Sequence, residues 1–316
     1  MKRTTSTNAL VLAAVAALAL SACSSTAVGT PSSTNSADTS GTTGLPQDVT
    51  APIVAAVEVD EDAAARLPEG TTSLTVGSNL QSPPTTFLAG DGTTPIGDEI
   101  DIINAIGGKL GVDVQIENMQ FDTLINSLET ERVDLTIAAM NDNVKRQEVI
   151  DFVDYFDSSI GILIQKGNPE GITTTADLCG HDVNGVEGST SVAWVTEESP
   201  NLCENGETIN IVTNPSDQQR LNDLKTGRVV AALNDLPYVV YVSQTAGNGN
   251  DFEVLDTEPL LAAPYGIGFN KNNSDVRDAV QAALQSLMDD GTYEQILDAW
   301  GLARGARTEA SINGGN

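Results

Sequence analysis

The segment MNDNVKRQEVIDF places Lys145 and Arg146 side by side in an acidic chain, which has 15 Lys and Arg residues against 44 Asp and Glu residues. A guanidinium presents paired N–H donors in one plane, matches a carboxylate in bidentate geometry and stays protonated. This chemistry suits an anion-binding residue in a partly dry cleft. The alternative is a surface ion pair with Glu148 or Asp151, and exposed pairs contribute only about 0–1 kcal/mol.

Two hydroxyl side chains open a predicted helix in the segment GVEGSTS, residues 185–191. Ser189 and Thr190 follow a predicted strand, and hydroxyls beside the free N–H groups of a helix start suit an anion. Ordinary N-capping of the helix is the alternative for both residues. Asp235, in the segment NDLP, also begins a predicted helix, where its position is typical of an N-terminal cap.

The sequence offers little for known catalytic arrangements. Its one histidine, His181, stands beside Cys179 in a predicted turn, which gives Ser-His-Asp or Cys-His chemistry no support. Neither metal-ligand spacing nor a GxxxxGK[ST] phosphate loop is found. We therefore expect no catalytic residue, no metal and no cofactor. A lone catalytic carboxylate would escape such a search, so an enzyme remains an alternative.

The first 23 residues follow the order of an export signal. Lys2 and Arg3 precede an apolar run from residue 9 to residue 20, and small residues and Cys23 follow. The run is shorter than the roughly 20 apolar residues that a membrane-spanning helix needs. Residues 1–22 are therefore predicted to form a signal peptide that is removed.

The tetrapeptide LSAC resembles a bacterial lipobox, whose cysteine takes a diacylglyceryl group and becomes the new N-terminus. We expect Cys23 to be lipidated, with palmitate among its acyl chains, and the chain to be held at the extracytoplasmic face of the cell membrane by lipid alone. A stray cysteine in an ordinary signal peptide is the alternative. Without the signal, 13 basic residues oppose 44 acidic ones, a formal charge of −31. Such a charge excludes nucleic acid as a partner, because phosphates are repelled.

The two remaining cysteines, Cys179 and Cys203, belong to a chain with an export signal, where oxidation is permitted. Their even number and location predict a disulfide. A loop of this length would restrict the unfolded chain by roughly 3 kcal/mol in the entropy model. Two buried free thiols are the alternative.

Two segments of different composition precede the part of the chain that is predicted to form regular secondary structure. Residues 23–50 are rich in Ser, Thr, Gly and Pro, which predicts a lipid-anchored disordered tether with a reach of about 30 Å. Residues 51–70 are predicted to add a short helical extension around EDAAARL. From Ser73, short β-rich runs alternate with amphipathic helices, which indicates an α/β fold with largely parallel sheets.

The regular part is long enough for two lobes, and no Pro- or Gly-rich linker divides it. We therefore expect the lobes to exchange strands. SIGILIQKGN and APYGIGFNKNN are the candidate crossover strands. Lobe one would comprise residues 71–163 and 266–302, lobe two residues 164–265, and residues 303–316 would form a flexible tail.

Seven segments, taken in order, resemble the amino-acid-binding proteins of ABC importers, the bacterial extracellular solute-binding proteins of family 3, actinobacterial type. The resemblance runs from about Ser73 to Trp300 and implies the periplasmic binding protein type II fold, with two crossover strands joining two lobes around a ligand cleft. The segments are GDEIDIINAIGGKLG, FDTLINSLETERVDLTIAAM, MNDNVKRQ, GVEGSTS, LKTGRVVAALNDLP, PYGIGFNK and DDGTYEQILDAWG.

The resemblance assigns roles to the residues singled out above. Arg146 matches the arginine that grips the α-carboxylate of a bound amino acid in this family, and Ser189 and Thr190 match positions that bind the same carboxylate. Asp235 matches the acidic residue that receives the ligand's ammonium group. Opposite charges from the two lobes would thus hold one zwitterion, and lobe closure would follow ligand binding.

The sequence departs from the family around the ligand's side chain. Histidine- and lysine/arginine-type binders have an aspartate and then an aromatic ring ahead of a proline, where this chain has Asn79 and Ser82. Asn141 replaces the usual Ser or Thr five residues before the arginine. Phe121 matches another family contact, with packing in the core as its alternative. These changes weaken the case for a basic ligand.

The resemblance implies a solute-binding component that captures a polar amino acid and delivers it to an ABC permease, which ATPase subunits power. The chain is expected to act as a monomer. The alternatives are an enzyme on the same scaffold, of dehydratase or cell-wall lytic type, and a receptor module that reports ligand to a sensor.

Overall fold

The structure, a computed structural model, describes residues 50–204, 206–258 and 260–316. The predicted signal peptide, the lipidation site at Cys23 and the predicted tether up to residue 49 lie outside these residues. Within them, no helix has the length and apolar character that crossing a membrane requires. The folded part therefore carries the remaining predictions.

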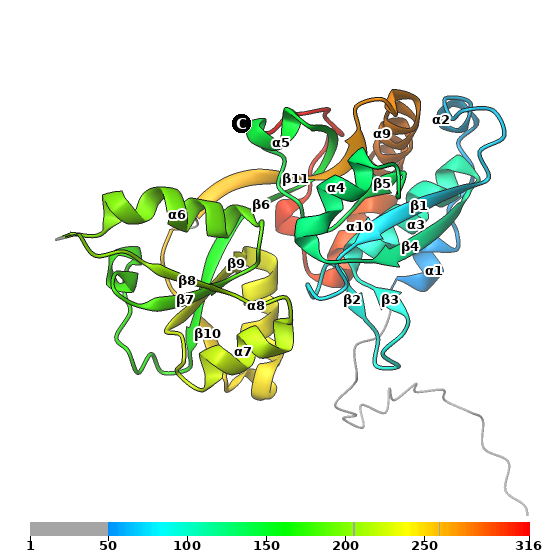
Figure 1. The fold of residues 1–316 in the computed structure, drawn as a ribbon. Coiled ribbons are helices and arrows are strands. Elements are labelled where there is room, and N and C mark those ends of the chain that lie inside the picture. Colours follow the sequence, from blue (N-terminus) through cyan, green and yellow to red (C-terminus); the bar gives the residue numbers. More distant parts are fainter. Residues whose placement is uncertain (1–49, 205, 259) are drawn as a thin grey trace, which may run out of the picture. The chain divides into compact units, whose positions relative to one another are not determined.

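A nine-stranded mixed sheet forms the centre of the fold (Figure 1). Its order is β4-β1-β5-β11-β6-β9-β7-β8, and β10 pairs with β6 beside this path. The strands are β1 (Ser73–Ser78), β4 (Asp113–Asn118), β5 (Leu135–Thr136), β6 (Ile150–Gln165), β7 (Asp182–Gly185), β8 (Asn210–Thr213), β9 (Ala231–Asp235), β10 (Phe252–Val254) and β11 (Leu260–Asn270). A separate hairpin pairs β2 (Phe87–Leu88) with β3 (Pro95–Ile96).

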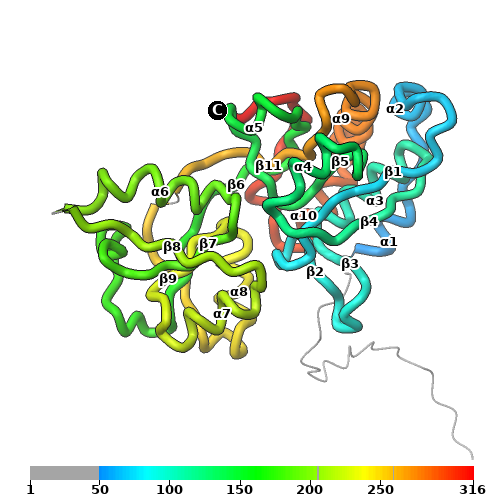
Figure 2. Tube along the Cα trace, in the orientation of Figure 1, coloured from blue at the N-terminus to red at the C-terminus, as the bar shows by residue number. Residues whose placement is uncertain are grey.

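Two long antiparallel strands, β6 and β11, connect the lobes, as Figure 2 traces. Strand β6 is buried at nearly every position along 16 residues, which is the mark of a strand covered on both faces. It begins beside β11 in lobe one and pairs with β9 from Ile160 onward. Lobe two therefore begins a few residues before the predicted boundary at residue 163.

Helices cover the parallel strands of each lobe. In both lobes the crossover helix follows a strand and returns the chain to a parallel neighbour, as α3 does between β1 and β4. Lobe one contains α3 (Asp98–Leu110), α4 (Leu124–Glu129), α5 (Val144–Gln147), α9 (Ser274–Asp289) and α10 (Thr292–Trp300). Lobe two contains α6 (Thr190–Leu202), α7 (Asp217–Lys225) and α8 (Leu236–Thr245).

Each lobe has its own apolar cores. In lobe one, Ile103 and Ile106 of α3 pack with Leu284 of α9, and all three are fully buried. In lobe two, Ile162 of β6 packs with Val183 and Leu233 of the neighbouring strands. Separate cores allow the two lobes to move as bodies about the shared strands.

The predicted disulfide joins Cys179 and Cys203 in lobe two, with a sulfur–sulfur distance of 1.98 Å. It ties the segment before β7 to the end of α6. The segment expected to hold a short helix contains two, α1 (Ala51–Val54) and α2 (Glu61–Ala64), which contact α3 and α9. In α2, the side chain of Asp60 caps the first turn.

The prediction of a flexible tail at residues 303–316 is wrong, because this segment packs along lobe one. Ser311 and the backbone N–H of Gly314 donate to the buried carboxylate of Asp154, at 2.7 and 3.0 Å. The N–H of Gly315 donates to Asp142 at 2.8 Å. We call residues 306–316 the C-terminal strap. Its hydrogen bonds to buried carboxylates hold the strap against lobe one.

Candidate functional site

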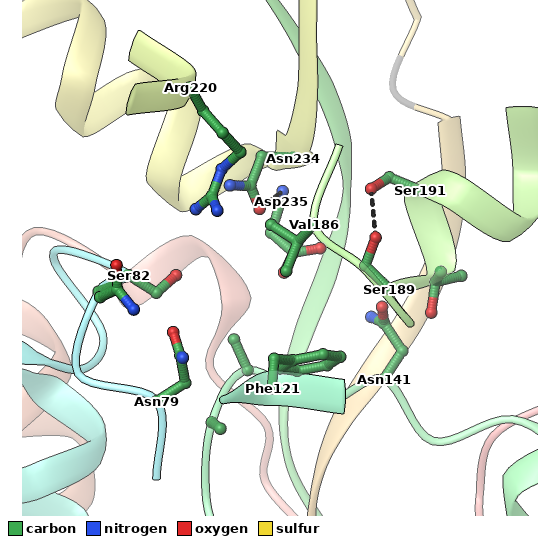
Figure 3. Close-up of a pocket in the computed structure, with 14 residues that line it drawn as sticks. Asn79, Ser82, Phe121, Asn141, Val186, Ser189, Ser191, Arg220, Asn234 and Asp235 are labelled. Atoms are coloured by element: carbon green, nitrogen blue, oxygen red, sulfur yellow. Dashed lines mark hydrogen bonds between the residues drawn. The ribbon is translucent and has the colours of Figure 1, made fainter. Parts of the chain in front are cut away.

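A pocket that is partly open to solvent lies where the lobes meet (Figure 3). Residues from both lobes line it. Lobe one provides Asn79, Gln81, Ser82, Phe121, Ala138, Ala139 and Asn141. Lobe two provides Val186, Ser189, Thr190, Ser191, Arg220, Asn234 and Asp235. Seven of the eight predicted ligand residues are thus in this wall, and Arg146 is the exception.

The lobe-one wall consists mainly of neutral polar groups that follow strand ends. Asn79 comes directly after β1, and its amide donates to the carbonyl of Met119 at 3.0 Å. Ser82 pairs with Thr86 in a short bridge. The side-chain oxygen of Gln81 accepts the N–H of Asp217 from lobe two at 3.2 Å. The lobes are therefore in contact at the mouth of the pocket.

Arg146 lies behind the ring of Phe121 and not in the pocket wall. Its guanidinium carbon is 5.6 Å from the ring centroid. One terminal nitrogen donates to the carbonyl of Asn141 at 2.7 Å, and the other donates to the carbonyl of Gly188 in lobe two at 3.0 Å. The short helix α5 positions it, with Asn143 capping that helix. The predicted cation is thus beside the pocket and spans the lobes.

Burial lowers the pKa of Arg146 to about 10, and the carboxylates of Asp235 and Asp142 oppose this shift. The guanidinium remains charged at neutral pH. The hydrogen bonds to Asn141 and Gly188 use two of the five N–H donors of the guanidinium. Donors are therefore left for an anion.

The first turn of α6 presents its hydroxyls to the pocket. Ser189 caps the helix by accepting the N–H of Val192 at 3.3 Å, and it lies 2.8 Å from the hydroxyl of Ser191. The hydroxyl of Thr190 is buried and has no hydrogen-bond partner within the described part of the chain. Capping thus occupies Ser189, whereas Thr190 has a hydroxyl available for a ligand.

Asp235 precedes α8 but does not cap it, since its side chain accepts no hydrogen bond from the first turn. Burial raises the pKa of this carboxyl to about 7, although Tyr265 and Arg146 favour its charged form. The hydroxyl of Tyr265 in turn receives a hydrogen bond from Ser158 at 2.9 Å. Asp235 is therefore an acid whose charge responds to a cation placed beside it.

A second buried acid, Glu99, lies under the pocket and was not found from the sequence. It accepts the N–H of Ala139, a lining residue, at 2.8 Å, and also the hydroxyl of Tyr155. Burial raises its pKa to about 8, and the charge of Asp235 adds to this. In the sequence, Glu99 had the appearance of an ordinary acidic residue at a helix start. Its contacts come from Ala139, in the loop after β5, and from Tyr155 of β6.

Arg220 of α7 was also missed. Its side chain is almost fully buried, with 7% of the residue exposed, and it lines the pocket near Asn234. The guanidinium donates to the carbonyl of Asn214 and to Asp217. Arginine is scarce in this acidic chain, and this scarcity was the sequence signal that could have indicated a role for Arg220. No cluster of His, Cys, Asp and Glu suited to a metal occurs in residues 50–316 as described.

Comparisons with known proteins agree with this architecture. The family model of the bacterial extracellular solute-binding proteins, family 3, matches residues 74–303. The arginine-binding protein ArgT of Corynebacterium glutamicum is 29% identical over 76% of this chain and 78% of its own length. The L-cystine-binding protein TcyJ of Escherichia coli is 28% identical over 72% of this chain and 82% of its own.

A solved structure of an ancestral arginine-binding protein bound to arginine superposes with a TM-score of 0.65 and 31% identity. The match covers 72% of this chain and 97% of that one. The fold is therefore that of a type II periplasmic binding protein, as the sequence predicted.

Proposed function

Because this chain belongs to the bacterial extracellular solute-binding proteins of family 3, we propose that it binds a free, polar amino acid between its lobes and delivers it to an ABC permease. The permease and its ATPase subunits are partners implied by this role. The amino-acid ligand is supported by the relatives named for arginine and L-cystine. The chain acts as a monomer in this proposal.

One observation carries the proposal: Asp235 of lobe two lines the pocket, and Arg146 of lobe one lies beside it, against the ring of Phe121. The charge of each favours the charged form of the other, against the effect of burial on both pKa values, which supports a shared role for Arg146 and Asp235. The unpartnered hydroxyl of Thr190 adds a donor beside them. A zwitterion fits this set, with its carboxylate toward Arg146 and Thr190 and its ammonium toward Asp235.

The test is a calorimetric titration of the wild type and the variant Arg146→Ala with the amino acid found in a thermal-shift screen of all twenty. Removal of one partner of a buried charge pair costs about 3–5 kcal/mol, a loss of several hundredfold or more. Lys145→Ala is the matched control, because it removes an exposed charge one residue away. Near-normal affinity in Arg146→Ala would reject the role given to Arg146.

Two other expectations complete the proposal. Cys23 carries the lipid that holds the protein at the extracytoplasmic face of the membrane, and intact mass spectrometry of the membrane-extracted protein tests this.

Binding leaves the amino acid chemically unchanged. Recovery of the ligand by chromatography after long incubation separates this role from the enzyme alternative, and a converted product would favour the enzyme. Neighbouring permease and ATPase genes would favour import over the receptor alternative.

A further inference from the structure

We propose that the ligand carries a second carboxylate and that Arg220 receives it. This inference rests on the proposed amino-acid binding and names the class of ligand: a dicarboxylic amino acid. Arg220 is the one basic residue that lines the pocket in the described part of the chain. The roles implied by the family resemblance include none for it.

Arg220 is placed away from the groups that hold the amino-acid head. In Figure 3 it lies beside Asn234, on the same side of the pocket as Asn79 and Ser82 and away from Ser189. It also lines the adjoining pocket formed with residues 213–215. A ligand whose head lies near Thr190 and Asp235 would therefore extend its other end toward this guanidinium.

The guanidinium is held but not saturated. Its hydrogen bonds to Asn214 and Asp217 use two of its five N–H donors and fix its direction. With 7% of the residue exposed, water gives little compensation for the rest. A carboxylate in the pocket would receive the remaining donors in the planar, paired geometry that guanidinium favours.

Charge in the pocket excludes a basic side chain. Arg220 and Asp235 are the two ionisable residues that line the pocket in the part of the chain described, and Asp235 is taken by the ligand's ammonium. Asp217, the partner of Arg220, is shared with the hydroxyl of Tyr238 and does not line this pocket. A side chain that carries a second guanidinium or ammonium without a carboxylate would meet a buried cation, whereas a carboxylate would neutralise it.

The second carboxylate has two chemical sources. It is the side chain of aspartate or glutamate, or it is the second amino-acid end of a longer diacid such as cystine. The lobe-one wall suits either, because Asn79, Gln81 and Ser82 are neutral and add no repulsion. The two sources differ in length and in the extra ammonium, so a direct titration distinguishes them.

The experiment is calorimetric titration of the ligand-free, full-length protein with glutamate, aspartate, cystine, glutamine and arginine. The wild type should bind at least one of the three diacids about a hundredfold more tightly than arginine and more tightly than glutamine, since a close charge pair across an interface contributes several kcal/mol. Glutamate or aspartate binding best assigns the side-chain carboxylate, and cystine binding best assigns the longer diacid. Preference for arginine or glutamine would overturn the inference and leave amino-acid binding intact. Binding of none of the twenty amino acids or cystine would reject both.

The variant Arg220→Gln should lose about a hundredfold in affinity for the preferred diacid and change little toward glutamine. Arg228→Gln is the matched control, because it removes the same charge from an exposed position of lobe two, where the side chain is 70% exposed. Equal loss for every ligand in Arg220→Gln would overturn the inference in favour of a structural role for Arg220. If Arg220→Gln is too unstable to titrate, Arg220→Lys replaces it, because lysine keeps the positive charge without the paired N–H donors. Arg220→Lys should keep the preference for diacids. Loss of that preference would count against the inference.

Discussion

The two lobes contribute different chemistry to the same pocket. Lobe one presents amides, one hydroxyl and the ring of Phe121, whereas lobe two presents both ionisable residues of the described wall, Arg220 and Asp235. The lobe-one cation, Arg146, lies behind this wall and reaches lobe two through the carbonyl of Gly188. The ionisable residues of the wall therefore belong to lobe two, whereas lobe one supplies Arg146 behind the wall, shape and neutral hydrogen bonds.

The lobes are also stabilised in different ways. Lobe two is cross-linked by the disulfide between Cys179 and Cys203. Lobe one is bound by the C-terminal strap, which hydrogen-bonds to Asp154 and Asp142. One lobe thus depends on a covalent link that restricts its unfolded chain, and the other on polar contacts to buried acids.

The largest effect is expected from removing the lobe-two acid. Asp235→Asn should weaken ligand binding by about 3–5 kcal/mol, because the ligand's ammonium would be left without its counter-charge. The lobe-one variant Asn141→Ala should lose only about 0.5–1.5 kcal/mol, the contribution of a neutral hydrogen bond. Calorimetry at constant salt compares them. Equal losses would contradict the view that the charged wall residue of lobe two contributes more to binding than the neutral wall residues of lobe one.

Asp235 also predicts the pH dependence of binding. The free protein holds this carboxyl at a pKa near 7, chiefly because of burial, and the bound ammonium favours its charged form. Affinity should therefore rise as the pH increases from 6 to 8 in the wild type. In Asp235→Asn the rise should be absent, and a pH profile that the substitution leaves unchanged would assign the titration to another group.

The next effect concerns the stability of lobe two. The double variant Cys179→Ser, Cys203→Ser should lower the free energy of unfolding by roughly 3 kcal/mol, since 24 positions separate the linked residues and the freed loop adds entropy to the unfolded chain. Urea titration measures this change. A wild type treated with reductant is the control, and it should approach the double variant. An unchanged unfolding midpoint would show that the link contributes little to this lobe.

The smallest effect concerns the strap on lobe one. Burial raises the pKa of Asp154 to about 6, with the neighbouring charge of Asp142 adding to the shift, while Ser311 opposes it. A raised carboxyl pKa gives stability that is complete below the unfolded value and is lost as the pH rises through about 6. Asp154→Asn should therefore reduce the gain in melting temperature between pH 7 and pH 5. Identical pH profiles would exclude Asp154 as the titrating group.

Local sequence patterns predicted the regular elements well. The runs SLTVGS and DVQIEN coincide with β1 and β4, because apolar residues that alternate between turn signals specify a strand locally. The predicted strand VDLTIAA is shorter in the structure, where β5 ends at Thr136. Ala139 leaves it with a positive φ of 49° and directs its N–H to Glu99. The strand ends where the backbone forms the pocket floor, which no local pattern reveals.

Seven of the predicted ligand residues line one pocket, but the sequence did not indicate the full composition of its wall. From the sequence, Asp235 could be a helix cap or a ligand residue, and the structure shows no capping bond from its side chain. Arg220 and the C-terminal strap were missed or misjudged for one reason. The burial of Arg220 depends on the loop at Asn214, and the place of the strap depends on Asp154, so contacts distant in the sequence decide both.

Capture of a free zwitterion by opposite charges is tested by titrating the wild type with its preferred amino acid and with two blocked forms of it, the N-acetyl derivative and the α-methyl ester. The first lacks the ammonium for Asp235, and the second lacks the carboxylate for Arg146 and Thr190. Each blocked form should bind at least about a hundredfold more weakly than the free amino acid, as expected when a buried charge loses its partner. Comparable affinity for the free and blocked forms would contradict binding by the two charges.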